Sequence, residues 1–177
     1  MIDLCKKCFE LNTVGSFYCN QAEAGKHLTG YIAAYCEDEM IIKHISPDGY
    51  YDGFILLHIS DLIRIDMLGQ YEQKVSALYV LRKQHHPFLD CSNNSYFPTL
   101  MDFASENGLV VTVELDNSVI SGFVEHYNEH MTCLQVINEF GLADGTTILI
   151  NDSILSVAVD TSHEQNLKLL NENDMDN

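Results

Sequence analysis

Positively charged residues are scarce in this sequence. Its 177 residues include nine Lys and Arg against 26 Asp and Glu, which gives a formal net charge of −17. Nucleic-acid-binding proteins draw much of their affinity from Lys and Arg side chains that neutralise phosphates. The composition therefore excludes a DNA-binding role, disfavours RNA and disfavours an anionic membrane as partners.

Long apolar runs are also missing. No stretch approaches the roughly 18 to 20 apolar residues that a helix needs to cross a bilayer. Residues 1–5, MIDLC, lack the basic flank and long apolar segment of a signal peptide. We therefore expect no membrane partner, a cytoplasmic location, and cysteines that stay reduced rather than form disulfides.

Motifs for catalysis and cofactor binding are absent. The sequence has no phosphate-binding glycine loop, no nucleophile elbow and no second CxxC. Cys5 and Cys8 form the one CxxC, and a structural zinc site commonly needs two such pairs. We treat these two cysteines as weak metal candidates and expect them to pack as small apolar residues. The sequence predicts a protein that is not an enzyme and has no cofactor.

One polar cluster lies between two expected strands. His126, Glu129, His130 and Cys133 are close in sequence and are of types that bind metals or move protons. Side chains alternate between the two faces of a strand, so the four are not expected to converge. We interpret the cluster as a polar hairpin tip.

What the sequence does contain is a repeat. Residues 28–78 recur as residues 120–170 at a constant separation of 92 positions, and apolar positions of one half align with apolar positions of the other. We interpret this pattern as an internal duplication. Residues that keep their identity include Gly30, Tyr35, Glu37, Ile45, Gly49, Asp52, Gly53, Glu72, Gln73 and Leu78, which recur as Gly122, Tyr127, Glu129, Ile137, Gly141, Asp144, Gly145, Glu164, Gln165 and Leu170.

Each half of the repeat predicts a helix followed by five short strands. In the first half the pattern indicates a helix over residues 2–11, a loop or irregular hairpin end over 20–27 and a second helix from Tyr71. Strands are expected at 16–19, 28–36, 40–45, 54–59 and 62–66, and in the second half at 110–115, 119–127, 131–137, 146–150 and 154–160. Tight turns leave no room for crossover helices, which favours an antiparallel meander that curls into a small barrel. The predicted fold is mainly β with short helices, as two tandem five-stranded antiparallel barrels with flanking helices.

The predicted boundaries follow the repeat. Residues 1–84 form the first small barrel, 85–96 a linker, 97–170 the second barrel, and 171–177 a disordered acidic tail. His85 and His86, beside Pro87, are expected to be exposed linker residues.

The second half resembles a known superfamily. The segments LMDF at 100–103, GLVVTVELDN at 108–117, ISGFV at 120–124 and ILINDSILSV at 148–157 resemble the Sm-like superfamily, which includes the Sm proteins and the bacterial host-factor RNA chaperone. The resemblance covers most of residues 97–160 and, more weakly, residues 8–66. It implies a small, strongly bent five-stranded barrel. Proteins of this superfamily commonly assemble edge to edge into rings, and the rings bind single-stranded RNA. The Lys-His and Arg-Gly pairs that contact RNA in the family are not matched here.

These features together predict an acidic, non-enzymatic protein-interaction or assembly module. Its partner is expected to be protein, with self-association through barrel edge strands. These edges are expected to pair either between the two halves of one chain, as a pseudo-symmetric dimer, or between chains, as a closed ring. The candidate edge residues are Phe54, Leu56, Leu62, Ile65, Ile148, Ile150, Ile154 and Val157. The alternative is an RNA-binding ring or regulator, in which exposed aromatics would stack on bases. The candidate stacking residues are Tyr50, Tyr51 and Phe140.

Overall fold

The computed structural model describes residues 1–19, 27–92 and 95–175, and the chain divides into two compact units, Met1–Tyr96 and Phe97–Asn177. The described residues are mainly β, with ten antiparallel strands and four α-helices. The prediction of a mainly β fold with short helices is therefore confirmed. The loop expected at residues 20–27 lies, except for His27, outside the described residues.

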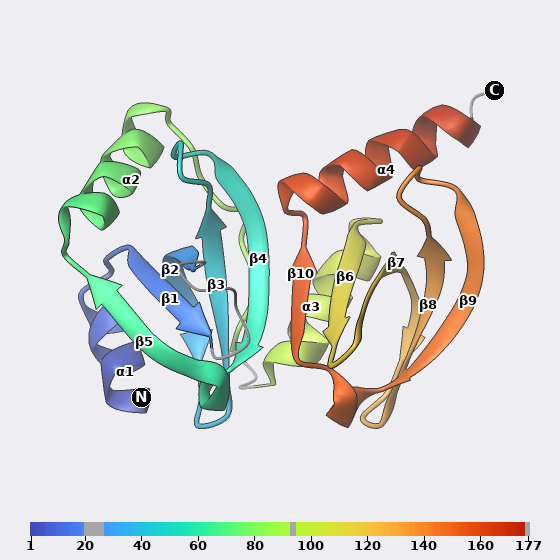
Figure 1. Cartoon of the computed structure of the whole chain (residues 1–177), viewed down its shortest axis with the longest axis horizontal. Helices are drawn as coiled ribbons and strands as arrows, with labels where there is room; N and C mark the ends of the chain where they lie inside the picture. The colour runs from blue at the N-terminus through green and yellow to red at the C-terminus, as the bar shows by residue number, and fades with distance from the viewer. Residues whose placement is uncertain (20–26, 93–94, 176–177) are drawn as a thin grey trace. The chain divides into compact units, whose positions relative to one another are not determined.

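The first unit is one antiparallel sheet with a helix at each end of its sequence (Figure 1). Its strands lie in the order β5-β1-β2-β3-β4, so the last strand returns beside the first. A 3₁₀ turn at Ile59–Asp61 makes the sharp change of direction between the last two strands. The elements are α1 (Ile2–Glu10), β1 (Gly15–Cys19), β2 (Leu28–Tyr35), β3 (Glu39–Ile45), β4 (Tyr51–His58), β5 (Leu62–Met67) and α2 (Gln70–Leu81).

The second unit has the same element order. Its strands lie in the order β10-β6-β7-β8-β9, and a 3₁₀ turn at Asn151–Ser153 again separates the last two. The elements are α3 (Tyr96–Glu106), β6 (Val110–Leu115), β7 (Ser118–Tyr127), β8 (Met131–Ile137), β9 (Ala143–Ile150), β10 (Ser156–Val159) and α4 (Ser162–Met175).

The two units agree in strand register as well as in order. Gly30 pairs with His44 across β2 and β3, and Gly122 pairs with Val136 across β7 and β8. A β-bulge interrupts the first pair between Ile32 and Ala34 and the second between Val124 and His126, at equivalent positions. The spacing of 92 residues does not extend to the first strand of each unit. Gly30 and Gly122 are 92 positions apart, but their partners on the first strands, Gly15 and Val111, are 96 positions apart. The first unit has the longer connection at that point.

The repeated Glu-Gln pair anchors the last helix of each unit. Gln73 Nε2 donates to the carbonyl of Leu68 at 2.8 Å, and Gln165 Nε2 donates to the carbonyl of Asp160 at 2.8 Å. Leu68 and Asp160 both adopt the left-handed conformation, with φ of 64° and 58°. A non-glycine residue there costs about 1 kcal/mol, and the side-chain hydrogen bond helps to hold it. The preceding glutamates, Glu72 and Glu164, are buried at the third position of α2 and α4.

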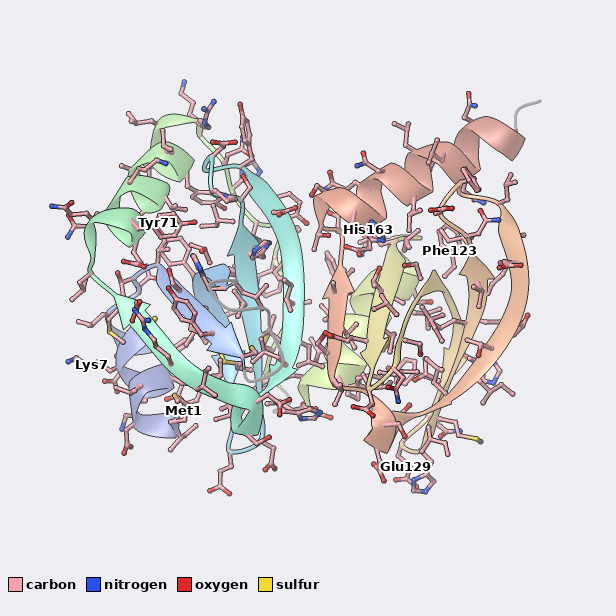
Figure 2. All side chains as sticks on the ribbon, viewed as in Figure 1. Met1, Lys7, Tyr71, Phe123, Glu129 and His163 are labelled. Atoms are coloured by element: carbon pink, nitrogen blue, oxygen red, sulfur yellow. The ribbon has the colours of Figure 1, made fainter. Side chains whose placement is uncertain are left out.

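Each sheet packs its last helix on an equivalent apolar cluster. In the first unit Val14, Ile45, Val75 and Tyr79 are buried together, with Tyr71 packed against them (Figure 2). In the second unit the cluster is Val110, Ile137 and Leu167, with Phe123 against it. Burying a side chain such as Val75 fully contributes about 1.5–3 kcal/mol. These contacts place α2 and α4 over their own sheets.

Two predicted boundaries are corrected. Residues of the expected linker fold onto the first unit: Tyr96 is buried, and its hydroxyl donates to the carbonyl of Tyr35 at 2.8 Å. The expected tail is helical through Met175. Asn171 Nδ2 donates to the Gly141 carbonyl at 2.8 Å, which ties the last turns of α4 to the loop before β9 and explains why this acidic segment is ordered.

Candidate interaction edges and binding residues

Two strands are paired on one side only and present apolar side chains to solvent. Among the described residues, β9 pairs with β8 alone and β5 pairs with β1 alone. On β9, Ile148 is 65% and Ile150 is 62% exposed, and on β5, Ile63 is 60% exposed. An exposed, apolar edge strand is a template for pairing with another chain. These two strands are the candidate interaction edges.

The predicted edge residues divide between exposed and buried positions. Ile148 and Ile150 are exposed, and Ile65 is partly buried. The rest are buried, namely Phe54, Leu56, Leu62, Ile154 and Val157. Leu62 and Ile154 immediately follow the 3₁₀ turns, where the backbone directs them inward. Sequence reasoning missed Ile63, although its place next to the inward Leu62 in an alternating strand could have indicated exposure.

The predicted stacking aromatics differ in their exposure and in their neighbours. The exposed Tyr50 has the Arg82 guanidinium 4.3 Å above its ring, and Arg82 Nη1 donates to its hydroxyl at 2.7 Å. Tyr51 is partly buried and contacts the His86 ring edge-on, with centroids 4.7 Å apart. Phe140 is exposed on the turn before β9, in the other unit. Only Phe140 therefore presents a ring without a described aromatic or cationic neighbour.

The CxxC cysteines are core residues of α1. Cys5 and Cys8 are both buried, and Cys8 Sγ donates weakly to the carbonyl of Thr13 at 3.5 Å. Burial raises the pKa of both thiols, to about 11 for Cys8. Among the described residues, no third ligand of the His, Cys, Asp or Glu type joins them. Met101 and Ala104 occupy the same inward positions of α3 and are also buried.

His86 has a structural role that the sequence did not reveal. Its Nε2 lies 2.9 Å from the His44 carbonyl and 3.1 Å from the Gly53 carbonyl, so this nitrogen carries the proton and donates. Its Nδ1 accepts from the Tyr79 hydroxyl at 2.8 Å. Burial lowers the pKa of His86 to about 4. The expectation of an exposed linker histidine is therefore wrong for His86 and holds for His85, which is exposed.

The bulge in β7 gathers a set of metal-binding side chains. Val124 pairs with Leu134 and His126 pairs with Cys133, so Glu125 is the extra residue. The ligand atoms of Glu125, His126 and Cys133 all lie within 4.8 Å of one another. The four residues singled out in the sequence do not all converge, as expected, but the bulge adds Glu125, which the sequence did not single out, beside His126 and Cys133. Glu129 and His130 lie instead at the hairpin tip and pair with each other at 3.1 Å (Figure 2).

A shallow apolar hollow of about 500 Å³ lies along α2. Leu68, Val80 and Leu81 line it and are exposed. At the positions of Val80 and Leu81, the second unit has Glu172 and Asn173. This apolar surface therefore belongs to the first unit only.

No protein-family model, curated protein or solved structure matches this chain. None of the described helices combines the length and the apolar character that crossing a bilayer requires.

Proposed function

We propose that this chain is a non-enzymatic assembly module, built by duplication of an Sm-like small barrel and acting in the cytoplasm. The helix, the five-stranded antiparallel order and the 3₁₀ turn between the last two strands in each unit support the Sm-like assignment. The shared register, the paired bulges and the paired left-handed residues support the duplication.

The observation that carries the proposal is the exposed apolar edge of β9. A strand eight residues long with Ile148 and Ile150 exposed offers both backbone groups and apolar surface to a partner. The partner is a second copy, which offers β5 with Ile63 exposed. Burying one such isoleucine contributes about 1.5–3 kcal/mol.

Pairing β9 of one copy with β5 of the next is a head-to-tail contact. Such contacts use two different surfaces of the same chain and generate a closed ring when the rotation between copies closes. Copies with a net charge of −17 repel one another, and salt screens this repulsion. Self-association is therefore expected to strengthen as salt is added.

RNA binding is the alternative function, and the exposed Tyr50 with its neighbouring Arg82 is the observation that favours it. A cation and an aromatic side chain at one surface are suited to a phosphate and a base. Phosphate contacts release counterions, so RNA affinity falls with salt. The two functions therefore predict opposite responses to salt.

Size exclusion with light scattering, recorded at two ultraviolet wavelengths, tests the proposal. The wild-type chain is expected to give a multimeric mass with a protein-only spectrum, and a mass that grows with salt. The chain has no Trp, so bound nucleic acid would be conspicuous. A high short-wavelength ratio that disappears in high salt would support the RNA alternative instead.

The Ile148→Lys variant tests the edge directly. It places a charge at the centre of the proposed contact and is expected to weaken self-association by at least about tenfold. Val119→Lys is the matched control, because Val119 is 63% exposed on β7, which is not an edge strand of its unit. The variant should lose the added stability that assembly gives. Since Ile148 is exposed, its thermal midpoint should equal that of the wild-type chain diluted until it dissociates. A wild-type monomer at all salt concentrations, or equal effects of the two substitutions, would refute the edge-pairing proposal.

A further inference from the structure

The bulge in β7 carries a ligand set that the assembly function does not require. It offers a thiol, an imidazole and a carboxylate from Cys133, His126 and Glu125, on two adjacent strands. Thiolate and imidazole ligands together select zinc and its neighbours among the divalent cations, and disfavour magnesium and calcium.

The bulge explains why these three side chains meet. In a regular strand Glu125 and His126 would point to opposite faces. The extra residue of a bulge breaks this alternation, and two residues then oppose one on the partner strand. Glu125 and His126 therefore both lie beside Cys133, whose thiol donates to Glu125 Oε2 at 3.2 Å.

The equivalent bulge of the first unit shows that the fold does not require metal-binding residue types at this position. The first unit has its bulge between Ile32 and Ala34, at the equivalent position of β2. There the residues that correspond to Glu125, His126 and Cys133 are Ala33, Ala34 and Ile41. The bulge is thus compatible with small or apolar side chains, and the second unit alone has three ligand types at it.

The surroundings of the three residues also suit a cation. The Cys133 side chain is buried, with 4% of its surface exposed, whereas Glu125 and His126 are exposed. One ligand is therefore fixed by packing, and the two outer side chains are able to move. Ligand atoms of a tetrahedral zinc ion lie about 3.5 Å apart, given bond lengths of about 2.0–2.3 Å. The three ligand atoms lie within 4.8 Å of one another, so metal binding requires the exposed Glu125 and His126 side chains to move closer to Cys133.

We propose that Glu125, His126 and Cys133 form a binding site for one Zn²⁺ or a similar divalent transition-metal ion, with a fourth position open to water. Binding replaces the thiol proton that now lies between Cys133 Sγ and Glu125 Oε2: the S–H bond breaks, the proton passes to the buffer, and the thiolate sulfur coordinates the metal.

Cobalt titration of the reduced, chelator-treated full-length chain tests this site, with excess magnesium present to occupy exposed carboxylates. We expect one equivalent of Co²⁺ to give a thiolate-to-metal charge-transfer band and the visible bands of four-coordinate cobalt, both removed by one equivalent of Zn²⁺. About one proton should be released for each metal bound.

Substitutions assign the ligands. Cys133→Ser should abolish the charge-transfer band, and His126→Ala and Glu125→Gln should each weaken binding by at least about tenfold. The two last variants change exposed side chains, so they keep the test valid if the buried Cys133→Ser variant unfolds. His130→Ala and Cys91→Ser are the controls, since both residues lie outside the cluster. No charge-transfer band in the wild type, a band that survives Cys133→Ser, or a band lost in Cys91→Ser or Cys5→Ser would overturn the proposal.

Discussion

Acidification should destabilise the first unit through His86. The ordinary pKa of a histidine, near 6.5, applies to the unfolded chain, whereas burial lowers the pKa of His86 to about 4 in the folded chain. Because the folded-state value is the lower one, the unfolded chain binds more protons between these two pH values. The stability that neutral His86 provides is therefore complete above about pH 6.5 and is lost as the pH falls towards 4.

The size of this loss follows from the difference between the two pKa values. One unit corresponds to 1.36 kcal/mol, so the free energy of unfolding should fall by about 2 kcal/mol from pH 7 to pH 5 and by about 3 kcal/mol to pH 4. A loss of that size is a large fraction of the stability of a small domain. The protonated imidazole would have to donate from Nδ1 towards Tyr79, whose hydroxyl now donates to it.

A variant that cannot titrate isolates this effect from the many carboxylates. In His86→Gln the amide nitrogen is able to donate to the carbonyls of His44 and Gly53, and the side chain stays neutral at every pH. Urea unfolding of the full chain, followed by far-ultraviolet circular dichroism, should show a smaller loss on acidification for this variant than for the wild type. His85→Gln, at the exposed neighbour, should follow the wild type. Parallel curves for His86→Gln and wild type, or an NMR titration of His86 near pH 6.5, would refute the reasoning.

Two further predictions concern the second unit. Gly141 and Gly145 have φ of 78° and 83°, but an added Cβ would lie 2.6 Å from the Asn171 backbone nitrogen at Gly141 and has nothing within 4 Å at Gly145. Gly145→Ala should cost about 1 kcal/mol and Gly141→Ala at least about 1 kcal/mol more, measured as thermal midpoints, and equal costs would contradict the contact. Glu164→Ala should lower stability by about 1 kcal/mol, because Glu164 Oε2 accepts from both the backbone N–H and the hydroxyl of Thr161 at the start of α4. An unchanged midpoint for Glu164→Ala would show that this cap does not stabilise the helix.

The sequence predicted the strands and turns well, because alternating apolar residues and turn-forming residues act on the backbone nearby. The strands expected at residues 28–36 and 131–137 agree with β2 and β8 to within one residue. The helix expected at residues 2–11 agrees with α1 to within one residue. Such features depend on the residues next to them and are therefore visible in one sequence.

The failures have a different physical origin. The bulge at Glu125 requires a register that only the partner strand fixes, so the sequence did not indicate that Glu125 lies beside His126 and Cys133. The hydrogen-bond partners of His86, the carbonyls of His44 and Gly53, lie on β3 and β4, and the residues next to His86 in the sequence do not indicate them. Contacts between segments far apart in sequence decide both cases.

The segment after α2 is attached to the strands of the first unit by hydrogen bonds, and these attachments decide where a fragment that contains this unit should end. Gln84 Oε1 accepts from the Tyr51 backbone N–H at 3.1 Å, His86 donates to two strand carbonyls, and Tyr96 donates to the carbonyl of Tyr35. A cut at the end of α2 would remove these attachments and leave the first unit with unsatisfied strand groups. A fragment designed to contain the first unit should therefore extend to Tyr96, and cleavage next to the attached Gln84 and His86 should be slow.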